Sequence, residues 1–106
     1  MRREHYALDV KADDDNGDAF NCEDFVNMTV VLKPGKTGTV ILSVLTLQVS
    51  NDDGDSFRNY GTAADAGTEV TITLKDEAWT DLRVVTSSYV SGTPVATFAG
   101  DNSRTS

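Results

Sequence analysis

Residues 39–60 read Thr39-Val-Ile-Leu-Ser-Val-Leu-Thr-Leu-Gln-Val-Ser50, then Asn51-Asp-Asp-Gly-Asp55, then Ser56-Phe-Arg-Asn-Tyr60. The first part is rich in β-branched and other apolar residues, which favour an extended strand. The acidic middle part contains the Asn, Asp and Gly residues that form tight turns. The last part returns to aromatic residues. This order predicts a β-hairpin, which sets the architecture of the chain.

The apolar residues of the strand before that turn change parity. They are Val40, Leu42 and Val44 on one parity, then Leu45, Leu47 and Val49 on the other. Two explanations fit this pattern. A bulge near residues 43–45 exchanges the two faces of the strand. Alternatively, the first half is covered on both faces, by a second sheet and by a partner subunit, so that Val40, Ile41 and Leu42 become candidate contact residues.

Alternation of apolar and polar residues predicts further short strands on both sides of the hairpin. These strands lie near residues 6–10, 26–32, 70–74, 82–86 and 94–99. Turn signals separate the strands about every ten residues, and no segment keeps the 3.6-residue period of a helix. We therefore predict an all-β fold: a single small antiparallel β-sandwich, jelly-roll or Ig-like, with about seven short strands and no substantial helix.

The chain has 106 residues, a length that fits one domain. We expect that domain to span residues 1–106, with an N-terminal arm at about residues 1–10 and a polar C-terminal tail at about residues 100–106. The predicted core consists of Leu8, Val26, Met28, Val30, Leu32, Leu42, Leu45, Leu47, Val49, Val70, Ile72, Leu74, Trp79, Leu82, Val84 and Phe98.

The net charge of −8 restricts the partners of the chain. An acidic surface repels phosphate backbones and anionic membranes, so we predict neither nucleic-acid nor membrane binding. No apolar run approaches the ~20 residues of a membrane span. The single cysteine, Cys22, excludes an intrachain disulfide, and residues 1–6 lack the apolar segment of a secretion signal. These features predict synthesis and folding in the cytoplasm.

The residues that carry most enzyme chemistry are scarce. His5 is the only histidine and Cys22 the only cysteine, too few for a zinc site and without a motif that pairs them as base and nucleophile. We therefore predict no enzymatic activity, no catalytic residues and no cofactor. The acidic runs keep one alternative open, a loose calcium site. Its candidate ligands are Asp13, Asp15 and Asp18, or Asp52, Asp53 and Asp55.

Aromatic residues raise a second alternative, a sugar-stacking surface like those of carbohydrate-binding sandwiches. The candidates are Phe57, Tyr60, Trp79 and Tyr89. Flat aromatic faces suit pyranose rings, and neighbouring carboxylates accept hydrogen bonds from sugar hydroxyls. The simpler interpretation places Trp79 in the core or at the end of a sheet.

Three segments together carry a family resemblance. They read Leu47-Gln-Val-Ser-Asn-Asp-Asp-Gly54, Trp79-Thr-Asp-Leu-Arg-Val-Val85 and Tyr89-Val-Ser-Gly-Thr-Pro-Val-Ala-Thr97. The chain resembles, over residues 39–99, small β-sandwich virion proteins of tailed bacteriophages. It departs from their pattern in the extra acidic residues at 52–55, and in Phe57, where a tryptophan is expected.

The resemblance implies a non-enzymatic role as a head decoration (cement) protein. Such a protein is made in the host cytoplasm and located on the capsid surface of the virion, where it binds the major capsid protein and bridges its subunits. It also implies a homo-oligomer, either a dimer or a trimer. The N-terminal segment, with Arg2, Arg3 and Tyr6, and the edge strands are then the expected contacts. The alternatives are a tail or neck component, or a carbohydrate-binding module.

Overall fold

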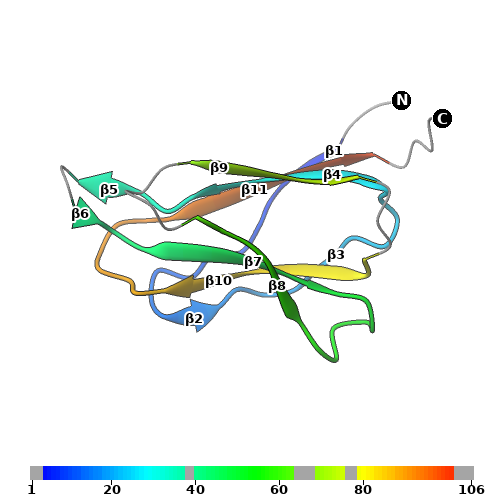
Figure 1. Cartoon of the computed structure of the whole chain (residues 1–106), viewed down its shortest axis with the longest axis horizontal. Coiled ribbons are helices and arrows are strands. Elements are labelled where there is room, and N and C mark those ends of the chain that lie inside the picture. The colour runs from blue at the N-terminus through cyan, green and yellow to red at the C-terminus, as the bar shows by residue number, and fades with distance from the viewer. Residues whose placement is uncertain (1–3, 38–39, 64–68, 76–78, 102–106) are drawn as a thin grey trace.

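The computed structural model describes residues 4–37, 40–63, 69–75 and 79–101, which are all strand, turn or loop. Eleven strands lie in this part of the chain, and seven of them have four residues or more, which confirms the predicted all-β fold (Figure 1). The strands are β1 (Glu4–Ala7), β2 (Asp15–Asn16), β3 (Phe20–Asn21), β4 (Asn27–Lys33), β5 (Lys36–Thr37), β6 (Val40–Ile41), β7 (Val44–Ser50), β8 (Arg58–Ala63), β9 (Val70–Lys75), β10 (Asp81–Ser87) and β11 (Val95–Asp101).

Two antiparallel sheets form the two layers of the molecule (Figure 1). The first sheet has the order β1-β11-β4-β9, and the second has the order β2-β10-β7-β8, with β3 also paired to β10. The pairs β7–β8, β4–β9, β2/β3–β10 and β1–β11 are nested inside one another along the chain. Nested pairs of this kind describe one long hairpin that is rolled up, which is the jelly-roll arrangement.

The position of β11 distinguishes the jelly-roll from the Ig-like topology, a choice that the sequence left open. In an Ig-like sandwich the last strand pairs with the strand before it, in the second sheet. Here β11 lies between β1 and β4 in the first sheet, in register from Val95↔Lys33 to Asp101↔Asn27. The sandwich is therefore a jelly roll, with β5 and β6 as a separate two-stranded ribbon at one end (Figure 1).

The hairpin predicted from residues 39–60 is present as β7 and β8. Its turn is held by Asp52, whose carboxylate accepts hydrogen bonds from Ser50 Oγ at 2.6 Å, Ser56 N at 3.0 Å and Ser56 Oγ at 2.6 Å. Asp53 and Gly54 take left-handed backbone angles, with φ of 60° and 88°. Glycine adopts this conformation without steric cost, which explains its place in the turn.

The parity change in the sequence does not reflect an exchange of faces between residues 42 and 49: Ser43 takes a buried position, and Leu42 and Val44 on either side of it are less buried. After β6 the chain turns at Leu42 and Ser43: Leu42 N donates to Gly35 O at 3.1 Å, and Ser43 Oγ donates to Pro34 O at 2.8 Å. The buried Ser43 begins the inward-facing series that continues through β7. The predicted bulge near residues 43–45 is therefore wrong: burial alternates without interruption from Ser43 to Val49, β7 keeps one register against β10, and the register shift against β8 falls between residues 47 and 48.

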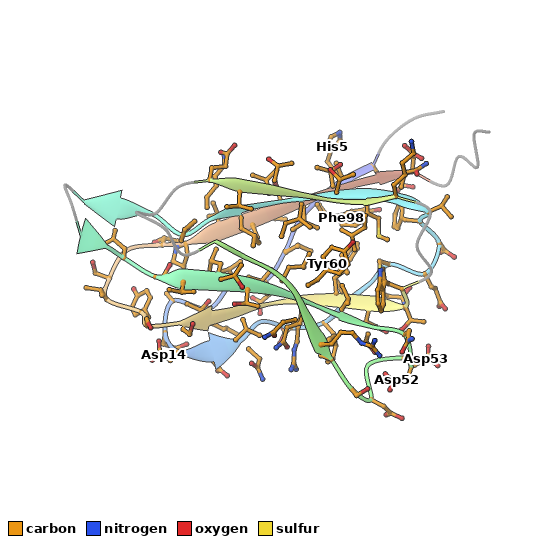
Figure 2. All side chains as sticks on the ribbon, in the orientation of Figure 1. His5, Asp14, Asp52, Asp53, Tyr60 and Phe98 are labelled. Atoms are coloured by element: carbon orange, nitrogen blue, oxygen red, sulfur yellow. The ribbon has the colours of Figure 1, made fainter. Side chains whose placement is uncertain are left out.

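The core lies between the two sheets, where Figure 2 shows Phe98. Most of the predicted core is confirmed, although Val26 and Leu42 are only partly buried, and the sequence did not predict Cys22 and Ala96. The buried apolar cluster consists of Leu8, Cys22, Met28, Val30, Leu32, Leu45, Leu47, Val49, Leu74, Leu82, Val84, Ala96 and Phe98. Val70, Ile72 and Trp79 are partly buried and pack against it.

The N-terminal segment from Glu4 to Val10 is part of the sandwich, whereas the sequence predicted an arm. Strand β1 pairs with β11, and the Tyr6 ring lies 5.2 Å from the Phe20 ring and 6.2 Å from the Phe98 ring, centroid to centroid. Leu8 is buried, and its backbone N donates to Ala96 O at 3.0 Å. At the other end of the chain, residues 100 and 101 belong to β11, and residues 102–106 lie outside the described part.

Candidate interaction surface

The outer face of the first sheet is uncharged along its two central rows of side chains. One row runs His5, Ala99, Thr29 and Thr73 across the four strands, and the next runs Ala7, Thr97, Val31 and Thr71. These residues alternate with the buried side chains of the same strands, so they point away from the core. We call these eight residues the neutral face.

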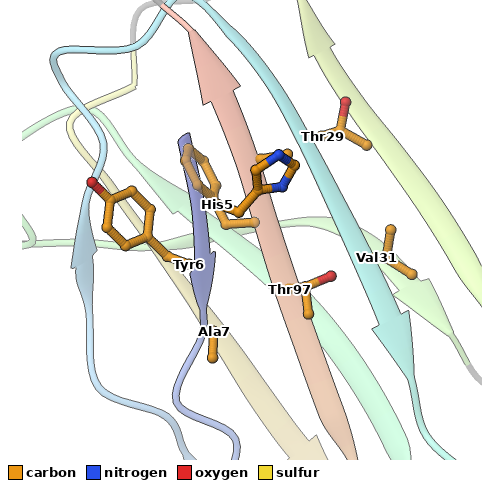
Figure 3. Close-up of a pocket in the computed structure, with 8 residues that line it drawn as sticks. His5, Tyr6, Ala7, Thr29, Val31 and Thr97 are labelled. Carbon is orange, nitrogen blue, oxygen red and sulfur yellow. The ribbon is translucent and has the colours of Figure 1, made fainter. Parts of the chain in front are cut away.

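A shallow hollow of about 540 Å³ opens on the neutral face, because the small side chains of β11 lie between taller ones (Figure 3). His5 lies on one side of it, on β1, and Thr29 and Val31 lie on the other, on β4, with Thr97 between them on β11, while Tyr6 leaves β1 in a different direction. A second hollow of about 480 Å³ shares Ala7 and Thr97 with the first. The surface therefore offers small apolar and hydroxyl groups to a partner.

Charges lie at the two ends of the neutral face. At one end Lys33 Nζ lies 3.6 Å from Glu69 Oε1, and both side chains are about half exposed. At the other end Asn27 Nδ2 donates to Asp101 Oδ1 at 3.1 Å, and Lys75 is opposite Asn27 on β9. The neutral face is thus framed by both signs of charge.

Strand β1 forms one edge of this sheet and, among the described strands, pairs with β11 alone. The Leu8 N to Ala96 O bond marks a hydrogen-bonded pair, and such pairs alternate along an antiparallel ladder. Tyr6 and Phe98 are therefore the next hydrogen-bonded pair. It follows that the backbone N–H and C=O groups of His5 and Ala7 point away from β11, toward the open edge.

The predicted contact residues do not gather in one place. Tyr6 lies on β1 and is 41% exposed, and its hydroxyl donates to Glu4 Oε1 at 2.6 Å, a bond that raises the pKa of Tyr6. Leu42 follows β6, at the end of the molecule that carries the ribbon (Figure 1). The backbone of residues 40 and 41 forms β6, but the side chains of Val40 and Ile41, and all of Arg2 and Arg3, lie outside the described parts.

The four aromatic residues proposed for sugar stacking are not arranged as one platform. The Tyr60 and Trp79 rings meet edge to face, at 83° and 6.2 Å between centroids. The Arg83 guanidinium lies 4.1 Å from the centroid of the Phe57 ring and covers one of its faces. Tyr89 belongs to the loop after β10, where its backbone N donates to Asp14 Oδ1 at 2.7 Å. The structure therefore does not favour the carbohydrate-binding alternative.

The acidic loops serve the local structure. Asp9 accepts a hydrogen bond from Asp18 N at 2.7 Å and pairs with Lys11 Nζ at 3.0 Å, and these two contacts lower the pKa of Asp9. Asp52 holds the β7–β8 turn, as described above. Within the described ranges, no three His, Cys, Asp or Glu side chains form a group that could hold a metal ion, so neither predicted calcium site is assembled.

His5 and Cys22 lie in different environments. His5 is exposed on the neutral face, whereas Cys22 is fully buried, with Sγ 3.4 Å from the Trp79 carbonyl oxygen. Burial raises the pKa of the Cys22 thiol to about 12, with a smaller contribution from Asp81. The thiol is therefore protonated at neutral pH, and the structure does not bring the two residues together as base and nucleophile.

Sequence reasoning missed the neutral face. Its signal was present in the alternation of β4 and β9, where Thr29, Val31, Thr71 and Thr73 occupy the positions between core residues. The pairing that brings these residues beside those of β1 and β11 joins distant segments of the chain. A strand pattern alone does not define such a surface.

No known protein family, curated protein or solved structure matches the chain. No helix of the described residues is long and apolar enough to cross a membrane.

Proposed function

We propose that the chain is a non-enzymatic virion structural protein, a capsid decoration (cement) protein of a tailed bacteriophage. It binds the major capsid protein from outside the shell, as a homo-oligomer, and reinforces the contacts between capsid subunits. The support is the resemblance over residues 39–99 together with the jelly-roll architecture, which occurs in viral capsid domains as well as in lectins and cupins.

The observation that carries the proposal is the open edge of β1 beside the neutral face. An open edge accepts an extended segment of a partner as an additional strand, because His5 and Ala7 present unshared backbone donors and acceptors to it.

The charge distribution also fits contact with a protein shell. The chain carries a net charge of −8, and Asp14, Asp52 and Asp53 lie on the opposite side of the molecule from His5 (Figure 2). A strongly acidic protein is repelled by nucleic acid and by anionic membranes. We therefore propose that the acidic side faces solvent and that the open β1 edge faces the capsid.

The reinforcement follows from mass action. A protein that binds the assembled shell, and binds free capsid subunits less well, lowers the free energy of the assembled state. Contacts to neighbouring subunits add avidity without requiring a large surface at each contact.

An Ala7→Pro variant tests this proposal. Proline removes the backbone N–H that Ala7 presents to the open edge. The pairing of β1 with β11 should persist, because Ala7 exchanges no backbone hydrogen bonds with β11. We expect the variant to fold and to lose at least tenfold in affinity for purified capsids, measured by co-sedimentation. The matched control is Ala7→Ser, which keeps the backbone donor, adds little bulk to the neutral face and should bind as the parent chain does.

Full binding by a folded Ala7→Pro variant would rule out strand addition at β1. Failure of the parent chain to bind capsids would remove the decoration role itself. Localisation at one vertex or along the tail would favour the tail or neck alternative. Binding to a glycan array that is lost in a Trp79→Ala variant would favour the carbohydrate-binding alternative.

A further inference from the structure

The charges that frame the neutral face have an order that matches a second copy of the same face. Strand β9 carries Lys75 at one end, and Glu69 directly precedes its other end. On β4, Lys33 lies at the Glu69 end and Asn27 at the Lys75 end. A two-fold rotation that exchanges the two ends therefore sets positive groups against negative or neutral ones.

We infer that the neutral face is the contact between two copies of this chain, related by a two-fold axis that lies parallel to the sheets and perpendicular to the strands. This axis places each strand over the same strand of the second copy, running in the opposite direction. Glu69 of each copy then faces Lys75 of the other, which gives two equivalent ion pairs at the ends of the contact.

The sizes of the side chains match in the same arrangement. The two central rows exchange places, so His5 lies over Ala7 of the second copy, and Ala99 lies over Thr97. On β1 and β11 a larger group therefore meets an alanine, and the hollow beside β11 receives Thr97 of the other copy. On β4 and β9 side chains of similar size meet, Val31 over Thr29 and Thr71 over Thr73. No carboxylate of the central rows loses water in this contact, which limits the desolvation cost.

A two-fold axis parallel to the strands gives a worse charge pattern. It would place β9 over β1, so that Glu69 would face the end of β1 next to Asp9 of the second copy. Like charges at close range oppose association. The charge order of the sheet thus selects one of the two ways in which the faces can stack.

The contact is small. The four strands have 4, 7, 7 and 6 residues, and a rise of ~3.3 Å per residue with a strand spacing of ~4.8 Å gives roughly 400 Å² per copy. A stable interface usually buries about 800 Å² per partner. The free dimer should therefore be weak and should form at hundreds of micromolar. Because this axis superimposes β1 on β1, both open edges lie on the same side of the dimer, about 10 Å apart.

This last consequence rests on the proposed function: a dimer with two neighbouring edges can add strands from two capsid subunits at once. Self-association itself is measured on the purified chain and needs no capsid. Self-association and capsid binding can thus be tested, and can fail, independently of each other.

Sedimentation equilibrium of the full chain, up to about 1 mM, tests the inference. We expect a monomer–dimer equilibrium that Thr97→Asp weakens at least tenfold, because it places two carboxylates in the uncharged centre. The control is Thr62→Asp, an equal change at an exposed threonine on the outer face of the second sheet. Circular dichroism checks that both variants fold.

Charge exchange tests the axis. Lys75→Glu alone should weaken the dimer by about threefold to tenfold, since two exposed ion pairs become repulsive. The double variant Lys75→Glu with Glu69→Lys should restore the parent affinity. A chain that stays monomeric at 1 mM, or a dimer indifferent to Thr97→Asp, overturns the inference. A dimer that Glu69→Lys alone strengthens overturns the proposed axis.

Discussion

Asp52 shows how one side chain fixes the turn of the hairpin that governs the fold. Its carboxylate accepts hydrogen bonds from Ser50 on one side of the turn and from Ser56 on the other. The Ser50 hydroxyl, followed by the hydroxyl and backbone N–H of Ser56, lowers the pKa of Asp52 to about 2. The acidic turn is therefore a structural device rather than a metal site.

An Asp52→Asn variant should be less stable than the parent chain, by an amount that depends on pH. Because folding lowers the pKa from its ordinary value of 3.8 to about 2, the charged form stabilises the fold fully above about pH 4. This stabilisation is lost as the pH falls toward about 2. Urea unfolding should show the largest difference between parent and variant at about pH 6, shrinking below about pH 4.

Asp55→Asn is the matched control, since it removes an equal charge from the same turn but leaves the hydrogen bonds of Asp52 in place. A difference for Asp52→Asn that stays constant from about pH 6 to about pH 2 would contradict this role of the carboxylate.

Gly17 is required by a close approach of two segments. Its backbone N donates to Val84 O at 2.8 Å, and a Cβ at this position would collide with the Asp9 carbonyl oxygen and lie 2.8 Å from that of Val84. Both are backbone atoms, which cannot rotate away. A Gly17→Ala variant should lose roughly 2 kcal/mol or more of unfolding free energy, measured by urea denaturation. An unchanged unfolding midpoint would contradict this packing.

At the scale of elements, alternation of apolar residues was sufficient to predict the longer strands. It failed where a strand ends without a turn signal. The run that begins at Thr39 was predicted as one strand, but it is divided into β6 and β7 at Leu42 and Ser43, which donate hydrogen bonds to the carbonyl oxygens of Gly35 and Pro34. The bond partners lie in another part of the chain, so the local pattern did not reveal the break.

The N-terminal segment is the clearest difference at this scale. The sequence predicted an arm at residues 1–10, and also a short strand near residues 6–10 with Leu8 in the core; in the structure β1 completes a sheet and Leu8 is buried. Its contacts are with β11, almost ninety positions later in the chain, as in the pair Leu8 and Ala96. The sequence pattern predicted the burial of Leu8, but only the tertiary fold shows that the whole segment is held in the sheet by β11.

Deletion of residues 1–10 should therefore destabilise the sandwich, whereas loss of a detached arm would leave its stability unchanged. Loss of the buried Leu8 side chain by itself costs about 2–5 kcal/mol, and the deletion also uncovers the rings beside Tyr6. Thermal unfolding of the deletion should show a lower midpoint than deletion of residues 1–3. Equal midpoints would show that β1 behaves as an arm.

At the scale of the whole molecule, the sequence predicted a sandwich but left its topology open. The choice between jelly-roll and Ig-like depends on whether β11 joins β4 or β10, and both partners are apolar strands of similar length. The candidate surface has the same origin, since the neutral face exists only because β1, β11, β4 and β9 are neighbours. Pairing between strands that are distant along the chain thus determines both the topology and the neutral face, and a local sequence pattern does not predict such pairing.

The neutral face and the open β1 edge lie on one side of the molecule, and the labelled carboxylates lie on the other (Figure 2). We propose that this division orients the chain on a capsid, with the open β1 edge inward and the acidic side in solvent. Electron cryo-microscopy of virions from the genome that encodes the chain tests the proposal most directly. It predicts jelly-roll density outside the shell, across neighbouring capsid subunits, with β1 toward the capsid. Virions that carry the chain only at the tail or neck, or not at all, would contradict it.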